Sequence, residues 1–203
     1  MSASLYEELR SFLRSPDFSY ELTRCAAAFP ILILIAYGGS FLLPELRDEI
    51  VETMAIQMAE LADSQGSISA AALLGNNLSA CGISILYGLL PFVYLPALAL
   101  GANAMLLGVM AAYYTAHGYS LLVYLAALLP HGVLELPAMV ISFAAGLYLC
   151  GDLTRRLRKQ QTAPFLQTAA QLSRVYLLLI LPLLAAAALV EAYVTPWLLS
   201  FFI

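Results

Sequence analysis

The chain has 203 residues, of which 62% are hydrophobic and only 11% are charged, against roughly a quarter charged in an average soluble domain. Its mean hydropathy is +0.86. This number of charged side chains is too small to cover the surface of a soluble protein of this length. The excess apolar residues therefore require lipid. The composition predicts an all-α polytopic membrane protein. It excludes a soluble enzyme, a disordered chain and, at a net charge of −4, a nucleic-acid binder.

Five membrane spans follow from the apolar runs. A hydrocarbon core about 30 Å thick needs about 20 apolar residues of helix, and such runs cover residues 25–43, 71–90, 95–116, 121–150 and 175–194. The fourth run is too long for one regular span and contains Pro130 and Pro137. Proline removes a backbone donor and disrupts a helix, so we predict a single crossing by a broken helix. The first run is not followed by an A-x-A cleavage site and is predicted to be a retained signal anchor.

The basic residues orient these spans. The segment 44–70 carries one basic residue and six acidic ones, whereas eight of the nine basic residues precede the first span or lie between the fourth and fifth. Because cytoplasmic loops are rich in Lys and Arg, we predict a multi-pass protein of the cytoplasmic (inner) membrane with its N-terminus inside and its C-terminus outside. Residues 151–174 are then an inner basic loop.

Two amphipathic segments lie outside the predicted spans. Residues 1–24 form a cytoplasmic segment in which Leu5, Leu9 and Phe12 share one helical face. Residues about 45–63 form an outer helix with an apolar stripe and an acidic opposite face. A single apolar stripe must be buried against something, so this helix either caps the outer mouth of the bundle or docks an extracytoplasmic partner.

Several polar or helix-disrupting residues fall inside the spans, where lipid disfavours them. His131 and Glu135 are four residues apart and share a helix face. At a rise of 1.5 Å per residue, Asn77 lies about 10 Å, His131 about 15 Å, and Glu135 and Asn103 about 20 Å below the outer ends of their spans. We therefore predict one intramembrane polar site, made of Asn76, Asn77, Asn103, Pro130, His131, Gly132 and Glu135.

Three interpretations of this site remain open. Its side chains can hold the helices together by hydrogen bonds, or they can line a transport or proton pathway. A metal-dependent hydrolase is the third, but His131 and Glu135 supply only two ligands and the His-Glu-x-x-His motif is absent. We therefore predict no catalytic residue, metal or cofactor. Glu191 is placed at the outer end of the fifth span, within reach of water, and receives no role.

Small residues recur at spacing four on two spans. They are Ala104, Gly108 and Ala112 on the third, and Ala138, Ser142, Gly146 and Cys150 on the fourth. Such patterns bring backbones together, either within the chain or between protomers. The three cysteines, Cys25, Cys81 and Cys150, have no metal-ligand spacing and are expected to be buried thiols.

The segment Leu129–Ala138 (LPHGVLELPA), together with Asn76-Asn77 and with Asn103 and Gly108, resembles the stage II sporulation protein M family. The recognisable features of that family are a paired Asn opening the second span, an Asn-Gly in the third and Pro-His-Gly-x-x-Glu in the fourth. Here Asn103 is followed by Ala104 instead of Gly. The resemblance implies a five-span membrane protein without enzymatic activity.

In spore-forming bacteria the namesake of the family is a membrane scaffold that recruits cell-wall-degrading partners outside the cytoplasm. The resemblance therefore implies a scaffold for extracytoplasmic or membrane protein partners, and we expect a homo-oligomer in the lipid bilayer. A small transporter or channel component with an intramembrane His/Glu site is the alternative.

Overall fold

The computed structural model describes residues 2–60, 69–160 and 164–201. Over these residues the chain is helical, and five helical stretches are long and apolar enough to cross a membrane. The prediction of an all-α polytopic membrane protein is thereby confirmed. The five stretches are α2 (Pro16–Gly39), α4 (Ala70–Leu86) with η1 (Tyr87–Leu89), α5 (Leu95–Ala116), α6 (Leu121–Leu157), and a last stretch that runs from Phe165 to Leu198.

The last span is one long helix with two wider turns. It comprises α7 (Phe165–Val175), the π-helical segment η2 (Tyr176–Ile180), α8 (Leu181–Leu189), the π-helical segment η3 (Val190–Val194) and α9 (Thr195–Leu199). Each π-helical segment is followed within two residues by a proline, Pro182 or Pro196. Proline lacks an N–H and its ring collides with the carbonyl four residues earlier, and a wider turn relieves that collision.

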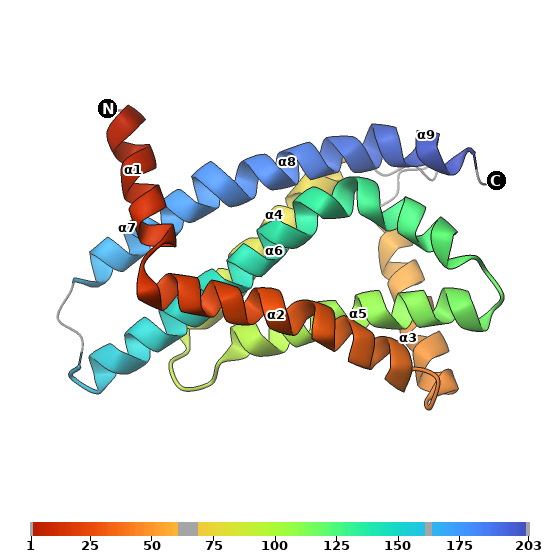
Figure 1. The fold of residues 1–203 in the computed structure, drawn as a ribbon, viewed down its shortest axis with the longest axis horizontal. Helices are drawn as coiled ribbons and strands as arrows, with labels where there is room; N and C mark the ends of the chain where they lie inside the picture. Colours follow the sequence, from red (N-terminus) through yellow and green to blue (C-terminus); the bar gives the residue numbers. More distant parts are fainter. Residues whose placement is uncertain (1, 61–68, 161–163, 202–203) are drawn as a thin grey trace.

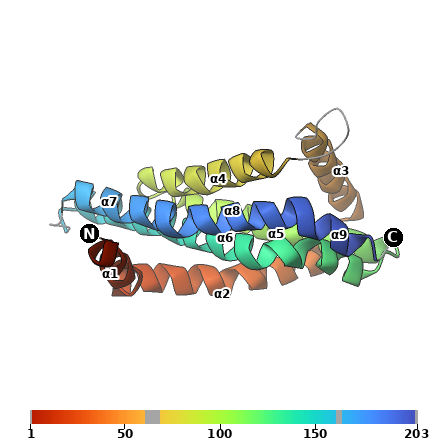
Figure 2. The ribbon, with the colours of Figure 1, turned by 90° about the horizontal axis from the view of Figure 1, so that it is seen from above.

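Helix α6 lies at the centre of the bundle and packs against α2, α4, α5, α8 and α9. Figure 2 shows α2 and α4 on opposite sides of it. The predicted break in α6 takes the form of a bend, because the helix continues without interruption through Pro130 and Pro137 and curves in its N-terminal half (Figure 1). Each proline costs one hydrogen bond, but the surrounding turns keep their own, so the helix kinks and does not unwind.

The small residues pack spans against each other within this chain. A Cβ on Gly108 would lie 2.8 Å from Ala36 Cβ of α2, and a Cβ on Gly146 would lie 2.8 Å from Pro96 Cγ of α5. The Ser142 hydroxyl donates a 2.6 Å hydrogen bond to the carbonyl of Cys81, which joins α6 to α4. Intrachain packing therefore accounts for Gly108, Ser142 and Gly146.

One end of the bundle carries α1 (Ser2–Leu13) and α7, which contact each other through an ion pair between Glu8 and Arg174. Within the predicted inner loop 151–174, α6 continues to Leu157 and α7 begins at Phe165, so much of this connection between the spans is helical. A buried Asp152 carboxylate stabilises this junction. It accepts hydrogen bonds from Arg156 Nε at 2.7 Å and Thr168 Oγ1 at 3.0 Å.

The predicted amphipathic segment 1–24 is likewise divided, because α1 ends at Leu13 and residues 16–24 already belong to α2. Pro16 occupies the first turn of α2, where its missing N–H would be unpaired in any case. Leu9 and Phe12 are buried, whereas Leu5 is exposed. The apolar face of α1 therefore packs partly on the bundle.

The opposite end of the bundle carries α3 (Pro44–Glu60), which packs on α5 (Figure 2). Arg47 is buried and donates a 2.7 Å hydrogen bond to Asp48, while Glu45, Glu49 and Glu52 are exposed. The Arg47 guanidinium holds the pKa of the Asp48 carboxyl below its ordinary value. Residues 61–63 of the predicted outer helix lie outside the described residues. The basic and acidic segments thus occupy opposite ends, while the side that faces the cytoplasm stays a prediction.

Candidate functional site

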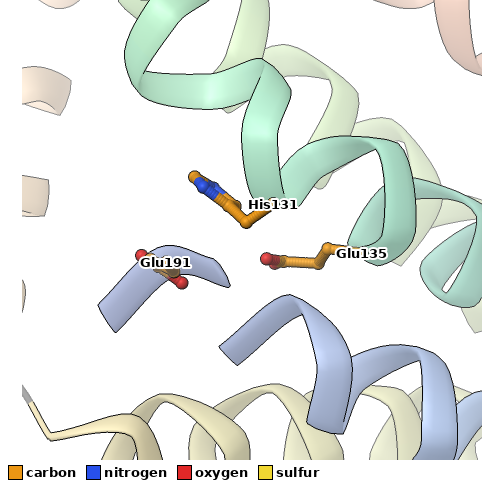
Figure 3. A group of neighbouring side chains, drawn as sticks. All are labelled: His131, Glu135 and Glu191. Atoms are coloured by element: carbon orange, nitrogen blue, oxygen red, sulfur yellow. The ribbon is translucent and has the colours of Figure 1, made fainter. Parts of the chain in front are cut away.

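Three ionisable side chains from two spans converge inside the bundle. His131 and Glu135 extend from α6, and Glu191 extends from η3 toward them (Figure 3). One ligand atom from each, a ring nitrogen or a carboxylate oxygen, lies within 4.8 Å of the other two. All three side chains are partly buried. We call these residues the His/Glu/Glu cluster.

The local backbone explains this convergence. His131 and Glu135 are one helical turn apart and therefore project from the same face of α6. On the last span, the Thr195 hydroxyl donates a 3.4 Å hydrogen bond to the Val190 carbonyl, five residues earlier, across the π-helical turn that carries Glu191. His131 Nδ1 lies 3.5 Å from the same Thr195 hydroxyl oxygen. Isolated π-helical turns are frequent at functional sites.

A cavity of about 120 Å³ adjoins the cluster at Glu135. Asn76 and Asn77 of α4 and Asn103 of α5 line it together with Glu135. The Asn103 amide donates a 2.8 Å hydrogen bond to the carbonyl of Ala99, and the Asn77 side chain lines the same cavity as Glu135. The structure thus brings the three asparagines and Glu135 together around one space between α4, α5 and α6, whereas His131 does not line it.

The cluster has no basic partner among the described residues. No Lys or Arg in that part of the chain forms an ion pair with Glu135 or Glu191. Placing one charged side chain at the centre of a membrane helix costs about 2.5–3.5 kcal/mol on translocon-insertion scales, and two neighbouring carboxylates repel each other in addition. A bound cation or proton lowers both costs.

Glu191 was not predicted to belong to this site. The fifth span was expected to end at residue 194, which left the acid near water, but the helix continues through Pro196 to the end of the candidate span at Leu198. At a rise of 1.5 Å per residue, Glu191 lies about 10 Å inside that end. The sequence signal that could have placed Glu191 inside the bundle is Thr195-Pro196. A helix can continue past a proline by forming a wider turn, so the span did not have to end before Pro196.

The remaining predicted site residues lie beside the His/Glu/Glu cluster or at the edge of the cavity. Pro130 and Gly132 lie within α6, where Gly132 is buried against the side chains of Leu128 and Leu136. Asn76 is exposed at the edge of the cavity, 3.4 Å from the Asn77 side-chain oxygen. Neither Pro130 nor Gly132 has a polar side chain, so the polar groups of the site come from His131, Glu135, Glu191 and the three asparagines.

Taken together, the fold and this site define a polytopic α-helical membrane protein with an ionisable cluster at membrane depth. The family model described as Stage II sporulation protein M matches residues 25–196 of the chain. The protein therefore belongs to the stage II sporulation protein M family, as the sequence motifs indicate. Searches of curated proteins and of solved structures gave no match.

Proposed function

We propose that the protein is a non-enzymatic scaffold of the cytoplasmic membrane that binds partner proteins through α3. Membership of the stage II sporulation protein M family supports a scaffold, because the family's namesake recruits partners outside the cytoplasm. In the proposed orientation, with the N-terminus inside and the C-terminus outside, α3 lies on the outer side. The protein acts as a homo-oligomer in this proposal.

The exposed acidic face of α3 is the observation that carries the proposal. Glu45, Glu49 and Glu52 are exposed, and Ile56 beside them is 57% exposed. An exposed face that mixes carboxylates with a large apolar side chain suits a protein partner with a basic rim, since complementary charge accelerates and orients association. The partly buried Ile50 and Met54 hold α3 on the bundle, which leaves the acidic face available.

Affinity purification from native membranes tests this function. The combined variant Glu45→Gln, Glu49→Gln and Glu52→Gln should lose a co-purifying protein that the wild-type chain retains. Glu7→Gln is the matched control, because Glu7 is also exposed but lies on α1 at the other end of the bundle. Equal recovery of every co-purifying protein with both variants would contradict docking through α3.

A transporter or channel component is the second candidate. The cavity that reaches Glu135 is the observation that favours it, because a hydrated pathway needs space beside its ionisable group. Proteoliposomes that contain the wild-type chain should then pass protons or cations faster than those that contain Glu135→Gln. Equal fluxes through both would remove this candidate and leave the scaffold.

A further inference from the structure

We infer that His131, Glu135 and Glu191 form a binding site for a divalent transition-metal cation of the Zn²⁺ type, which joins α6 to the last span. The sequence predicted no metal site because only two ligands could be identified. Glu191 supplies the third. This inference does not depend on the scaffold function, because the cluster lies inside the bundle and α3 lies at its end.

The ligand types select the class of cation. An imidazole nitrogen with two carboxylate oxygens suits zinc and related transition metals, whereas Ca²⁺ and Mg²⁺ prefer oxygen ligands alone. Zinc ligands lie about 2.0–2.2 Å from the ion, which places tetrahedral neighbours about 3.4 Å apart. The three ligand atoms already lie within 4.8 Å of one another, so closing around an ion requires side-chain shifts of about an ångström.

The neighbouring groups prepare His131 as a ligand. The Thr195 hydroxyl donates a hydrogen bond to the Val190 carbonyl, so its oxygen is free to accept a hydrogen bond from the N–H of His131 Nδ1. An imidazole that donates through Nδ1 keeps its lone pair on Nε2, and metal-ligating histidines are commonly oriented in this way by a second group. Asn77 lines the cavity next to Glu135.

Charge supplies an independent argument. Two carboxylates lie close together inside the bundle, and within the described part of the chain no Lys or Arg pairs with either. A divalent cation neutralises both carboxylates at once while the histidine stays neutral and acts as a ligand, whereas a single proton neutralises only one of them.

The experiment measures zinc in the full-length protein, purified in detergent and dialysed against a low zinc concentration. The wild-type chain should retain about one Zn²⁺ per protomer, and a chelator should lower its melting temperature. Because removing even a group behind a metal ligand costs about 10–100-fold in affinity, Glu191→Gln or Glu135→Gln should weaken Zn²⁺ binding at least about 100-fold. Glu52→Gln on α3 is the control and should bind zinc as the wild type does.

The direction of the stability change separates the possible outcomes. If zinc joins the helices, the chelator destabilises the wild type and leaves Glu191→Gln unaffected, and Ca²⁺ at the same concentration does not replace Zn²⁺. If the carboxyls share a proton instead, the chelator changes nothing in the wild type, which overturns the proposal. Retention of stoichiometric zinc by both Gln variants overturns it equally.

A measurement on the wild-type chain keeps the test valid even where a variant fails to fold. X-ray absorption at the zinc edge should show nitrogen and oxygen ligands at about 2.0–2.2 Å. The three buried cysteines, Cys25, Cys81 and Cys150, are the competing ligands. A sulfur shell at about 2.3 Å would place the ion elsewhere and contradict this site.

Discussion

Replacing Gly108 by Ala should separate α5 from α2. Gly108 is buried in the ridge that also contains Ala104 and Ala112. A Cβ at this position would lie 2.8 Å from Ala36 Cβ and 2.8 Å from Tyr37 N, and it would collide with the carbonyl oxygen of Ile33. Carbon atoms in good contact lie about 3.5–4.0 Å apart, so the added methyl group lacks about 0.7–1.2 Å of space.

Two opposing effects determine how much Gly108→Ala changes the free energy of unfolding. Overpacking a close contact costs about 1–3 kcal/mol, whereas Gly→Ala inside a helix gains about 0.5–1 kcal/mol from backbone entropy. Gly101→Ala on the same helix is the matched control, because no described neighbour lies within 4 Å of its Cβ position. Gly101→Ala should show only the gain in backbone entropy. Because both variants share that gain, their free energies of unfolding should differ by the overpacking cost, about 1–3 kcal/mol.

The assay is unfolding by SDS in mixed micelles, followed by circular dichroism and by the fluorescence of the single tryptophan, Trp197. Gly108→Ala should unfold at a lower SDS fraction than Gly101→Ala. Equal midpoints for the two variants would refute the close packing of α5 on α2. The ridge of small residues would then be assigned to an interface between protomers.

Two further predictions concern the ends of the bundle. Asp152→Ala should destabilise the α6–α7 junction by about 3–5 kcal/mol, because it removes the buried partner of Arg156 and Thr168; Asp152→Asn, which keeps an acceptor, should lower the melting temperature less. In α3, the pKa of Asp48 is lowered by the Arg47 guanidinium, so its stabilising contribution is present above the unfolded pKa and is lost as the pH falls through the folded one. Hydrogen exchange in α3, corrected for intrinsic rates, should therefore increase at acid pH in the wild type, and Asp48→Asn should remove this dependence.

The spans could be predicted because they depend on local composition. An apolar run of about 20 residues is long enough to cross the hydrocarbon core as a helix, and α5 begins and ends where the hydropathy predicts. The juxtaposition of His131 and Glu135 follows equally from the helical period. Both features depend on residues close together in sequence.

What could not be predicted depends on contacts between distant segments or on how proline is accommodated. The prolines of α6 were expected to interrupt the helix, yet they only bend it, because packing on the other four spans offsets the lost hydrogen bonds. Glu191 was excluded from the site because its helix was expected to end before Pro196. Asp152 was not recognised, because its partner Thr168 comes from a segment predicted to be a loop.

The central claim is that Glu191 of the last span faces His131 and Glu135 of the fourth inside the bundle. Cross-linking tests it most directly, in a chain whose three native cysteines are replaced by alanine. The pair Glu135→Cys and Glu191→Cys should form a disulfide rapidly in native membranes. The pair Val133→Cys and Glu191→Cys is the control, because Val133 is 65% exposed, and it should not form one. Rapid cross-linking of the Val133 pair in place of the Glu135 pair would contradict the account.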